Sequence, residues 1–512
     1  MKEILEKLDT NIIKWYDFDS TENVLQIGEN NNITEYLKTI FSEVKVVSKK
    51  DKIYLNDEKF DYILIYEIEK VENYKDIILS KLKENGKVLL IGNNQLGINN
   101  FSKYHFSEDC YAQEIEKDEN LLDSIETIKS KLKDFGFNVN IYSVYPNYKQ
   151  AELIFNENFN ISKNQIEKYN PDISEEDIKV FDEIKILKKI ITNNKEMLTN
   201  LCNSFFIEIS KNSNLNSVQY ASFNNVRKDK YKLITLIKDD VVEKKIAEKE
   251  AEEHLNQIKD NITNLQDLGF NILDYYDNNS ESQKIYSKLI KNEKTLDEIF
   301  AENYQNKSFI IESLKKVKEK LIKNSITYED CKDKITYCKD ESLLKNLHFM
   351  EKCYWDLIPK NCFYINNEFY FFDQEWEEDY LPVEFVIYRS IINSYDLIRH
   401  IDVNDILNEL NLKEYRELFE YIDKLLRDRI IDKEVYNEMY AKNIKGIDNY
   451  INDNKIYVEE IERNKKHIKD LENYVKALEN DNKSKQEYIE KLEKKDLISI
   501  LKRIKRGKND AK

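Results

Sequence analysis

One stretch of the sequence, from Trp355 to Trp376, restricts the possible folds more than any other. It reads WDLIPKNCFYINNEFYFFDQEW and holds two apolar runs, Cys362 to Ile365 and Glu368 to Phe372, separated by Asn366-Asn367. Asparagine tolerates the left-handed backbone that a two-residue turn requires, so this pair between β-rich runs predicts a tight hairpin. The remainder of the domain must accommodate an antiparallel strand pair at this point.

Three polar residues flank the predicted hairpin. Asp356 and Asn361 precede its first strand and Asp373 follows its second, so the oxygens of Asn361 and Asp373 could converge on one cation. Phosphoryl transfer from ATP needs such an arrangement, in which one Asp takes the proton of the acceptor hydroxyl while an Asn and a second Asp hold Mg²⁺. The pattern resembles the protein-kinase-like superfamily, in particular its small-molecule branch of choline and aminoglycoside kinases. We therefore expect Asp356 to be catalytic, Asn361 and Asp373 to bind metal, and ATP with Mg²⁺ to be the cofactors.

The segment before this stretch has the pattern of the β-rich lobe of a kinase. Four runs predict antiparallel strands: Phe205 to Ile209, Ser217 to Phe223, Tyr231 to Lys238 and Val241 to Ile246. A helix should follow, because apolar residues recur at spacings of four and three from Ala251 to Leu265.

A lysine and a glutamate of this segment are expected to serve ATP. Lys244 on the last strand would bind the α and β phosphates and pair with a glutamate of the following helix. We prefer Glu250 for this pair over Glu253, and Lys245 competes with Lys244. The competing interpretation is that these residues are solvated charges on a polar surface.

The loop that should cover the phosphates contains no glycine. None occurs between Gly136 and Gly269, so the expected loop, Ser210 to Asn216, would bond phosphate through Ser and Asn side chains and backbone amides.

Residues 1 to 158 alternate between strand and helix patterns, which predicts a parallel α/β sheet. The expected strands are Asn23 to Ile27, Val44 to Val47, Asp61 to Tyr66 and Lys87 to Ile91, closed by a pair at Asn138 to Tyr145 and Gln150 to Phe155. Helices are expected at Ile33 to Phe41 and Leu121 to Phe135. This order resembles the class I methyltransferases that use S-adenosylmethionine (SAM).

The residues expected to bind SAM depart from that family. Gln26 stands where an acidic residue is usual, and Gly28 alone remains of the loop glycines that let backbone approach a ligand. Ser48 occupies the place of the acid that bonds the ribose hydroxyls in nucleotide sites. Too few residues separate Ser48 from Asp61 for the usual helix and strand. We therefore expect a degenerate SAM site, with a retained structural domain favoured over a working methyltransferase.

The C-terminal segment carries a heptad repeat of apolar residues. Ile447, Ile461, Ile468, Val475 and Ile489 share one position, and Tyr450, Tyr457, Leu471, Leu478 and Leu492 share the position three later. Three Asn and one Lys interrupt the seam, and such polar residues fix register and strand number. A parallel dimer or trimer is therefore expected rather than a long solvated single helix.

The last residues, 497 to 512, mix apolar side chains with Lys and Arg. A short basic amphipathic helix binds anionic lipid headgroups, although helix-end solubility explains the pattern equally well. The whole chain has net charge -17, which argues against general nucleic-acid binding. No signal peptide opens the chain and no apolar run approaches the roughly 20 residues that span a bilayer, so we expect a cytoplasmic protein, peripheral on the inner face of the cell membrane.

The order of these segments resembles the bifunctional methyltransferase and kinase family that caps growing O-antigen chains. The fold class that follows is a Rossmann-like α/β domain, a bilobal α+β kinase-like domain and a helical coiled coil. The expected segments are 1–158, methyltransferase-like; 159–198, a helical connector; 199–425, kinase-like; 426–496, the coiled coil; and 497–512, the basic tail.

The resemblance also implies a function and partners. The expected activity is phosphorylation of a sugar hydroxyl of a surface polysaccharide or lipid-linked glycan by ATP, with glycosyltransferases as possible partners. Two alternatives stay open: a pseudoenzyme scaffold that organises glycosyltransferases at the membrane, and a methyltransferase/kinase with both activities.

Overall fold

The computed structural model describes residues 6–19, 22–50, 57–105, 110–111, 122–173, 177–194, 197–276, 284–291, 293–338, 341–440 and 445–509. The chain divides into two compact units. The first consists of Met1–Asp177 and Phe181–Ile444, and the second of Ile178–Val180 and Lys445–Lys512.

The first unit begins with a parallel sheet of four strands in the order β4-β3-β1-β2. These are β1 (Asn23–Ile27), β2 (Glu43–Val47), β3 (Phe60–Tyr66) and β4 (Leu82–Asn93), and each neighbouring pair is parallel. Parallel strands covered on both faces are apolar nearly throughout, as the run YILIY of β3 illustrates. The predicted parallel α/β sheet is therefore confirmed.

Helices cover both faces of this sheet, because successive strand residues point to opposite sides. One face packs against α2 (Asn11–Lys14) and α3 (Asn31–Lys38), with Trp15 fully buried among them. The other face packs against four helices: α4 (Lys75–Lys81), α7 (Ile125–Asp134), α9 (Glu183–Asn193) and α10 (Met197–Asn200). The helix predicted from Leu121 begins outside the described residues, and its described part is α7.

One strand does not lie where the sequence pattern predicts. Phe205 to Ile209, expected as the first strand of the kinase-like lobe, forms β10 (Ser204–Ser210). β10 lies between β4 and β7 (Asn138–Tyr145) and is antiparallel to both. Every residue of β10 is buried, so it is a central strand of the front sheet. The boundaries of the five segments expected from the sequence, such as residue 199 for the start of the kinase-like segment, stay predictions.

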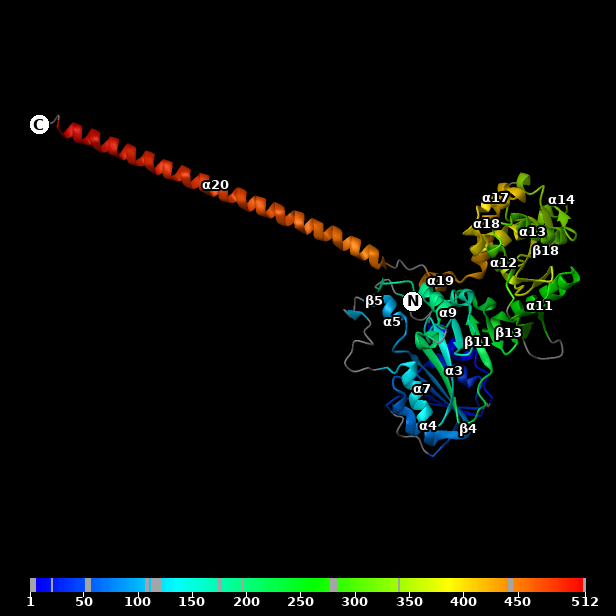
Figure 1. The fold of residues 1–512 in the computed structure, drawn as a ribbon. Helices are drawn as coiled ribbons and strands as arrows, with labels where there is room; N and C mark the ends of the chain where they lie inside the picture. The colour runs from blue at the N-terminus through cyan, green and yellow to red at the C-terminus, as the bar shows by residue number, and fades with distance from the viewer. Residues whose placement is uncertain are drawn as a thin grey trace. The chain divides into compact units, whose positions relative to one another are not determined.

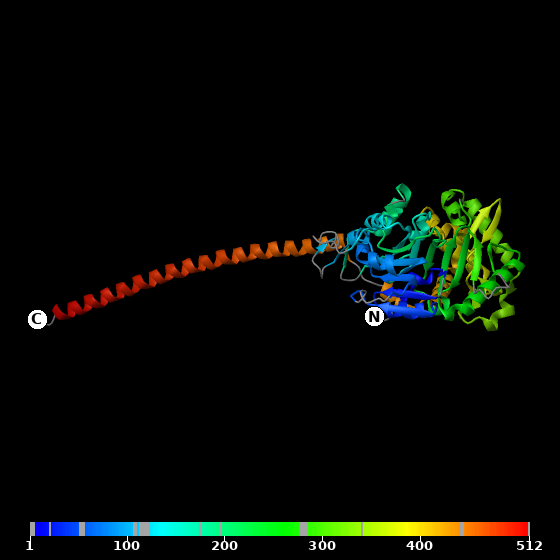
Figure 2. The ribbon, with the colours of Figure 1, turned by 90° about the horizontal axis from the view of Figure 1, so that it is seen from below.

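The front sheet continues without a break into the next lobe. β8 (Leu153–Asn156) pairs with β7 on one side and β11 (Val218–Phe223) on the other. Antiparallel strands then follow in the order β11-β12-β13-β16-β15. Their bounds are β12, Leu233–Lys238; β13, Val241–Ile246; β15, Asp274–Tyr275; and β16, Lys284–Lys288. Together they complete a 12-stranded sheet, whose strands run side by side in Figures 1 and 2.

The predicted amphipathic helix after β13 is confirmed as α11 (Glu252–Asp267). Leu255, Ile258 and Ile262 of α11 are buried against Leu233 and Ile285 of the sheet.

A helical lobe completes the first unit around its own core. Its helices include α12 (Leu296–Glu302), α13 (Lys307–Ile322), α15 (Val383–Ile392), α17 (Val403–Glu409) and α18 (Arg416–Ile430). β18 (His348–Tyr354) pairs with β17 (Ile326–Thr327) and β21 (Glu377–Pro382). β19 (Cys362–Ile365) pairs with β20 (Glu368–Phe371), and β20 also pairs with β14 (Asn271–Ile272).

The shorter elements of the first unit are η1 (Lys7–Thr10), η3 (Val71–Tyr74), α5 (Asn99–Ser102), β5 (Lys103–His105), β6 (Cys110–Tyr111), α8 (Lys163–Ile166), η5 (Asp229–Tyr231), η6 (Lys249–Ala251), α14 (Tyr328–Cys331), η7 (Lys332–Lys334), η8 (Glu341–Leu343), η9 (Pro359–Asn361), α16 (Tyr395–Ile398), η10 (Lys413–Tyr415) and α19 (Lys433–Tyr440).

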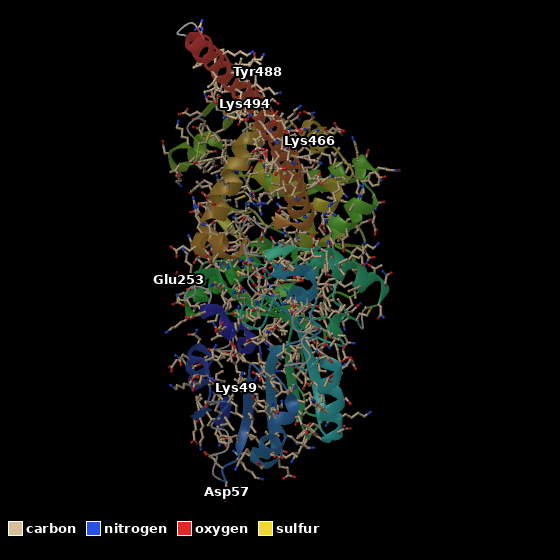
Figure 3. All side chains as sticks on the ribbon, turned by 90° about the vertical axis from the view of Figure 1, so that its left-hand side faces the viewer. Lys49, Asp57, Glu253, Lys466, Tyr488 and Lys494 are labelled. Atoms are coloured by element: carbon tan, nitrogen blue, oxygen red, sulfur yellow. The ribbon has the colours of Figure 1, made fainter. Side chains whose placement is uncertain are left out.

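The second unit consists mainly of α20 (Ile447–Asn509), preceded by β22 (Lys445–Gly446). Of β9 (Asp177–Lys179), Asp177 belongs to the first unit and the other two residues to the second. With 63 residues, α20 is about 95 Å long. Its side chains, among them Lys466, Tyr488 and Lys494, project all around it (Figure 3). Seven seam residues are exposed in the single chain: Ile461, Ile468, Leu471, Val475, Leu478, Ile489 and Leu492. No helix in the described part of the chain is long and apolar enough to cross a membrane.

Candidate phosphotransfer site

The predicted hairpin is present and sets the geometry of the site. β19 and β20 are antiparallel, with Cys362 opposite Phe371 and Ile365 opposite Glu368. Asn366 and Asn367 form the turn with φ angles of 52° and 67°. Two successive positive φ angles are what a type I′ turn requires, and asparagine adopts them more readily than most residues.

The hairpin brings Asp356, Asn361 and Asp373 to one place. The backbone N–H of Phe372 donates to the carbonyl oxygen of Asn361 over 3.0 Å, which closes the open end of the hairpin next to Asp373. The carbonyl oxygen of Asp356 accepts hydrogen bonds from the side-chain amides of Asn361 (3.3 Å) and Gln374 (3.1 Å). Hydrogen bonds therefore link Asp356 to Asn361, and link these two residues to Phe372 and Gln374 on either side of Asp373.

Lys244 reaches this place from β13, as the sequence predicts. Its ammonium group forms an ion pair with the carboxylate of Asp373 and a second one, 2.5 Å long, with Glu375. The competing Lys245 is the next residue along the strand and must point to the opposite face. Its ammonium lies 3.7 Å from the carboxylate of Asp17. The geometry therefore favours Lys244 over Lys245.

Glu250, the predicted partner of Lys244, does not occupy that position. It lies in η6 (Lys249–Ala251) and is exposed, and Glu253 is also exposed at the surface (Figure 3). The α11 residues that face the site are His254, Gln257 and Asn261. The side-chain amide of Asn261 donates to the carbonyl oxygen of Gln374 over 3.2 Å. The helix starts with a 3-10 turn, which alters the phase of the residues before Glu252, so extrapolating the apolar stripe backwards misplaces Glu250.

The carboxylate beside Lys244 comes instead from Glu375, which is 6% exposed. Its second oxygen lies 2.6 Å from the guanidinium of Arg227. Burial raises the pKa of Glu375, but the charges of Arg227 and Lys244 outweigh burial and hold that pKa well below its usual range. Glu375 is therefore ionised at neutral pH.

Asp356 is held by Arg389 of α15. One oxygen of its carboxylate lies 3.4 Å from the Arg389 guanidinium, which also bonds the Trp355 carbonyl oxygen over 3.0 Å and pairs with Asp423 of α18. Burial raises the pKa of Asp356 above its usual value, and the positive charge of Arg389 opposes this shift. A carboxylate with a raised pKa is a better proton acceptor than an exposed one.

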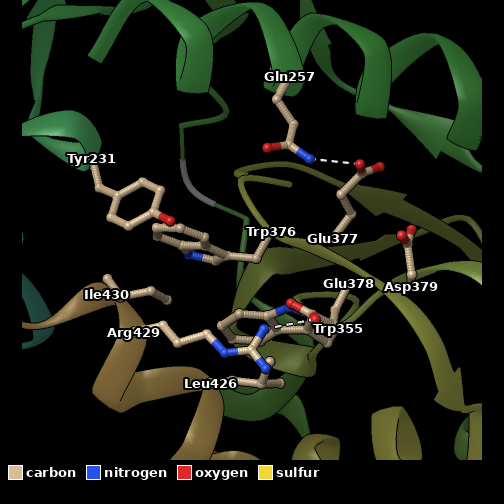
Figure 4. Close-up of a pocket in the computed structure, with 10 residues that line it drawn as sticks. All are labelled: Tyr231, Gln257, Trp355, Trp376, Glu377, Glu378, Asp379, Leu426, Arg429 and Ile430. Atoms are coloured by element: carbon tan, nitrogen blue, oxygen red, sulfur yellow. Dashed lines mark hydrogen bonds and ion pairs between the residues drawn. The ribbon is translucent and has the colours of Figure 1, made fainter. Parts of the chain in front are cut away.

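Rings stack in a column beside the site, and Figure 4 shows its two tryptophans, Trp376 and Trp355. The ring of His254 stacks on Trp376 with centroids 4.6 Å apart, Trp376 stacks on Trp355 at 5.7 Å, and the Arg389 guanidinium lies 4.4 Å from the Trp355 ring centroid. Burial lowers the pKa of His254 to about 4, so its ring is neutral at pH 7. The column connects α11 to the group that holds Asp356.

A pocket of about 260 Å³ opens next to this column (Figure 4). Tyr231 lies edge-on to Trp376 at one side of it. Two pairs of lining side chains interact with each other. Gln257 donates a hydrogen bond to Glu377 over 2.5 Å, and Arg429 forms an ion pair with Glu378 at 2.7 Å. Both His254 and Trp355 stack on Trp376, and the guanidinium of Arg227 lies 5.1 Å from the ring centroid of Trp376.

Five residues of the site were not predicted from the sequence: Arg227, Asp274, Glu375, Arg389 and Asp423. The carboxylate of Asp274 accepts the backbone N–H of Asp373 over 2.7 Å, and burial raises its pKa to about 6. Only Glu375 carried a local signal, because it lies two residues after Asp373 in DQEW.

The expected phosphate loop, Ser210 to Asn216, lies elsewhere. The side chain of Asn212 donates to Asn85 and the backbone N–H of Asn216 to Glu208, so the loop packs against the front sheet. The cause is the placement of β10, which carries the following loop with it. The segment that reaches the site is instead the one between β11 and β12, whose Arg227 pairs with Glu375.

The residues present provide oxygen ligands of the kind that Mg²⁺ takes. Asn361 uses its N–H group on the Asp356 carbonyl, which leaves its amide oxygen, together with the Asp373 carboxylate, as a donor. Among the described residues no group of three or more His, Cys, Asp or Glu side chains is arranged to hold a metal ion alone. Nucleotide-bound Mg²⁺ takes one or two carboxylates together with phosphate oxygens.

The residues of the expected SAM site bond to one another. Gln26 is fully buried, and its amide donates to the Gly28 carbonyl oxygen over 2.9 Å and accepts from the Thr34 hydroxyl over 2.9 Å. Gly28 has a φ of 95°, and a Cβ there would lie 2.7 Å from the Tyr66 carbonyl oxygen. Close packing against β3 therefore requires this glycine. Ser48 is half-buried just after β2.

A cleft of about 560 Å³ lies at the carboxyl ends of β1 and β3. β2 and β3 lie on opposite sides of β1, so this is the point of the sheet where ligands of α/β folds bind. The lining includes the carboxylates of Asp9, Glu29 and Glu67 and one cation, Lys149, which lies 3.0 Å from Glu67. Burial raises the pKa of Asp9.

No protein-family model matches the chain, and no curated protein sequence matches it. Three similar solved structures illustrate two groups. A SAM-dependent methyltransferase from Archaeoglobus fulgidus has a TM-score of 0.25 and 16% identity, and covers 41% of this chain and 94% of its own. Phosphoethanolamine N-methyltransferase 2 from Haemonchus contortus has a TM-score of 0.24 and 14% identity, and covers 40% and 52%. Choline kinase LicA from Streptococcus pneumoniae has a TM-score of 0.22 and 15% identity, and covers 34% and 69%.

The matched region thus spans about half the length of the nematode enzyme. Both classes that the sequence resembles, methyltransferases and small-molecule kinases, are represented among these structures.

Proposed function

We propose that the chain is an ATP-dependent phosphotransferase with an alcohol group as acceptor. The observation that carries this proposal is the ion pair between Lys244 and Asp373, formed beside the hydrogen-bonded Asp356 and Asn361. These four residues come from β13 and from both sides of the β19–β20 hairpin. A lysine, a catalytic Asp, an Asn and a metal-binding Asp in one place are the parts that phosphoryl transfer requires.

Each residue then has a role. Asp356 accepts the proton of the acceptor hydroxyl, and Arg389 holds its carboxylate in place. Lys244 binds the phosphates, and Asn361 and Asp373 hold Mg²⁺. When bound, the metal neutralises the charge of the triphosphate. Because Lys244 pairs with Asp373, the two groups must separate enough to admit phosphate between them.

The finer proposal concerns the acceptor and the setting. We propose a sugar hydroxyl of a bacterial surface polysaccharide, O-antigen-like or carried on a lipid-linked glycan, with the protein peripheral on the inner face of the membrane. This part rests on the sequence resemblance, and glycosyltransferases are the partners it implies.

One alternative retains support from the site itself. Asp373 is already paired with Lys244, and the segment between β11 and β12, which reaches the site, contains no glycine. A pseudoenzyme scaffold would tolerate both features. Titration calorimetry of the full chain with ATP in the presence of Mg²⁺, followed by an assay of ATP turnover with hydroxyl acceptors, distinguishes the two. Binding with turnover supports the kinase, whereas absence of both supports the scaffold.

For the front domain we propose a structural role without SAM binding. Gln26 and Gly28 are engaged in internal contacts, and no acid stands at Ser48. We expect millimolar SAM to leave the melting temperature unchanged. A ligand that binds only the folded state must raise it, so a shift of several degrees in a thermal melt would support an active methyltransferase instead.

We further propose that α20 associates with one or two further copies of the chain. Its apolar seam residues are exposed from Ile461 to Leu492, over five heptads of which the fourth carries Asn482 and Lys485 instead. Burial of such a seam drives coiled-coil formation. Beyond it, Leu497, Ile498, Ile500 and Leu501 are exposed beside Lys and Arg residues, as a helix that lies on anionic lipid requires.

Deleting residues 497–512 is expected to release the protein from anionic liposomes while its oligomeric state is retained. Each basic residue near the surface contributes about 1 kcal/mol at most, so tails joined in an oligomer bind far better than one tail. Flotation with vesicles measures the first effect and light scattering the second. Deletion from Ile447 onward should give a monomer. Flotation of the shorter deletion, or an oligomer from the longer one, would contradict this proposal.

A further inference from the structure

We infer that Glu375 is the positioning residue for Lys244, in place of a glutamate on the helix after the lysine strand. The inference rests on the proposed kinase function and assigns a role within the same site. It follows from a chain of three charges, Arg227–Glu375–Lys244, in which Glu375 is buried and the two cations are half-buried. This chain links β13 and the segment between β11 and β12 to the loop carrying Asp373.

The geometry of Glu375 fits a positioning role. One carboxylate oxygen lies 2.5 Å from the Lys244 ammonium and the other lies 2.6 Å from the Arg227 guanidinium, so both are engaged at hydrogen-bond distance. Charge-assisted bonds of this kind are about twice as strong as neutral ones. Because the group is almost completely buried, solvent screens the interaction little.

Arg227 is itself fixed, so it can hold Glu375 in one orientation. Its guanidinium lies 5.1 Å from the ring centroid of Trp376, the residue that follows Glu375. Trp376 in turn stacks on His254 and on Trp355. A rigid aromatic column therefore supports the arginine, the arginine supports Glu375, and Glu375 supports Lys244.

This arrangement couples Lys244 to the metal loop, the segment from Asp373 to Glu375 that carries the proposed metal ligand Asp373. Glu375 lies two residues after Asp373, and the backbone N–H of Glu375 donates to the carbonyl oxygen of Asp373 over 3.1 Å. A helix glutamate would allow Lys244 and Asp373 to be positioned independently. Here one short loop carries both Glu375 and Asp373, so Glu375 would still hold Lys244 if Asp373 bound Mg²⁺.

The test compares Glu375→Gln with Glu250→Gln in the full-length protein. Glu375→Gln removes one charge while keeping the shape, and leaves Lys244 paired with Asp373 alone. We expect the affinity for ATP with Mg²⁺, measured by calorimetry, to fall about 10- to 100-fold. Glu250→Gln, the matched control at an exposed site, should leave it unchanged. The KM for ATP should rise while the KM for the acceptor stays the same.

A double-mutant cycle separates positioning from general stability. If Glu375 acts through Lys244, Glu375→Gln should have no further effect on ATP affinity in a Lys244→Met background. If Glu375→Gln does not fold, as judged by its thermal melt, Glu375→Asp takes its place, because it keeps the charge but shortens the reach. Arg227→Gln should weaken ATP binding less than Glu375→Gln.

The outcomes are distinguishable. A wild-type chain that binds no ATP with Mg²⁺ overturns the proposed function, and this inference with it. A wild type that binds, with Glu375→Gln binding equally well or with additive effects of Glu375→Gln and Lys244→Met, overturns the inference alone. Weaker binding by Glu250→Gln than by Glu375→Gln would return the role to the helix.

Discussion

Replacing Asp356 with Asn is expected to lower kcat about 100- to 10,000-fold, the usual contribution of a general base. The amide cannot accept the proton of the acceptor hydroxyl, although it fills the same volume beside Arg389. The KM for ATP should change little. In the described part of the chain, the carboxylate of Asp356 contacts neither Lys244 nor Asp373. Steady-state measurement of phosphate transfer at saturating ATP gives both constants.

The control for this variant is Asp379→Asn, an exposed carboxylate on β21, which should retain wild-type turnover. The pH profile provides a second check. Because burial raises the pKa of Asp356, its basic form is lost at a higher pH than an exposed Asp would show. The acid limb of the wild-type profile should therefore lie above the ordinary pKa of aspartate and be absent from the residual activity of Asp356→Asn. Unchanged kcat would exclude Asp356 as the base.

Replacing Asp373 with Asn is expected to abolish the Mg²⁺-dependent part of ATP binding. Asp373 is the only carboxylate in the proposed metal pair, and its neutral replacement also removes one of the two charges that face Lys244. Calorimetry with ATP in Mg²⁺ and in chelator measures the effect. The wild type should bind more tightly with the metal, and the variant should show the same weak affinity in both buffers.

A variant that binds ATP with Mg²⁺ as tightly as the wild type would remove Asp373 from the metal site and leave the Lys244–Asp373 ion pair as a structural contact. Glu375→Gln differs from Asp373→Asn in its signature, because it should weaken ATP binding while preserving the dependence on Mg²⁺.

The sequence predicts those parts of this protein that short-range patterns specify. The hairpin follows from Asn366-Asn367, since two residues that tolerate positive φ between β-rich runs permit few other structures. α11 follows from one apolar stripe, and the strands of the front sheet follow from apolar runs at regular intervals. Asp356, Asn361, Lys244 and Asp373 could be named because they stand beside these local elements in a pattern that resembles the protein-kinase-like superfamily.

The choice of partners was beyond the reach of the sequence. The strand pattern of β10 is correct, but the residues of a strand do not state which strands it will pair with, and β10 inserts between β4 and β7. One displaced strand moves every loop attached to it, which is why Ser210 to Asn216 lies against the front sheet.

The sequence by itself therefore predicted many of the elements, the hairpin and four residues that the structure places around the open end of that hairpin, because turn chemistry and periodicity act over a few residues. Only the tertiary structure decided that Glu375 pairs with Lys244 and that Arg389 pairs with Asp356. An ion pair forms between whichever buried charges the packing of distant elements brings within about 4 Å. That packing depends on the whole core, with α15, the β11–β12 segment and the metal loop each contributing one charge.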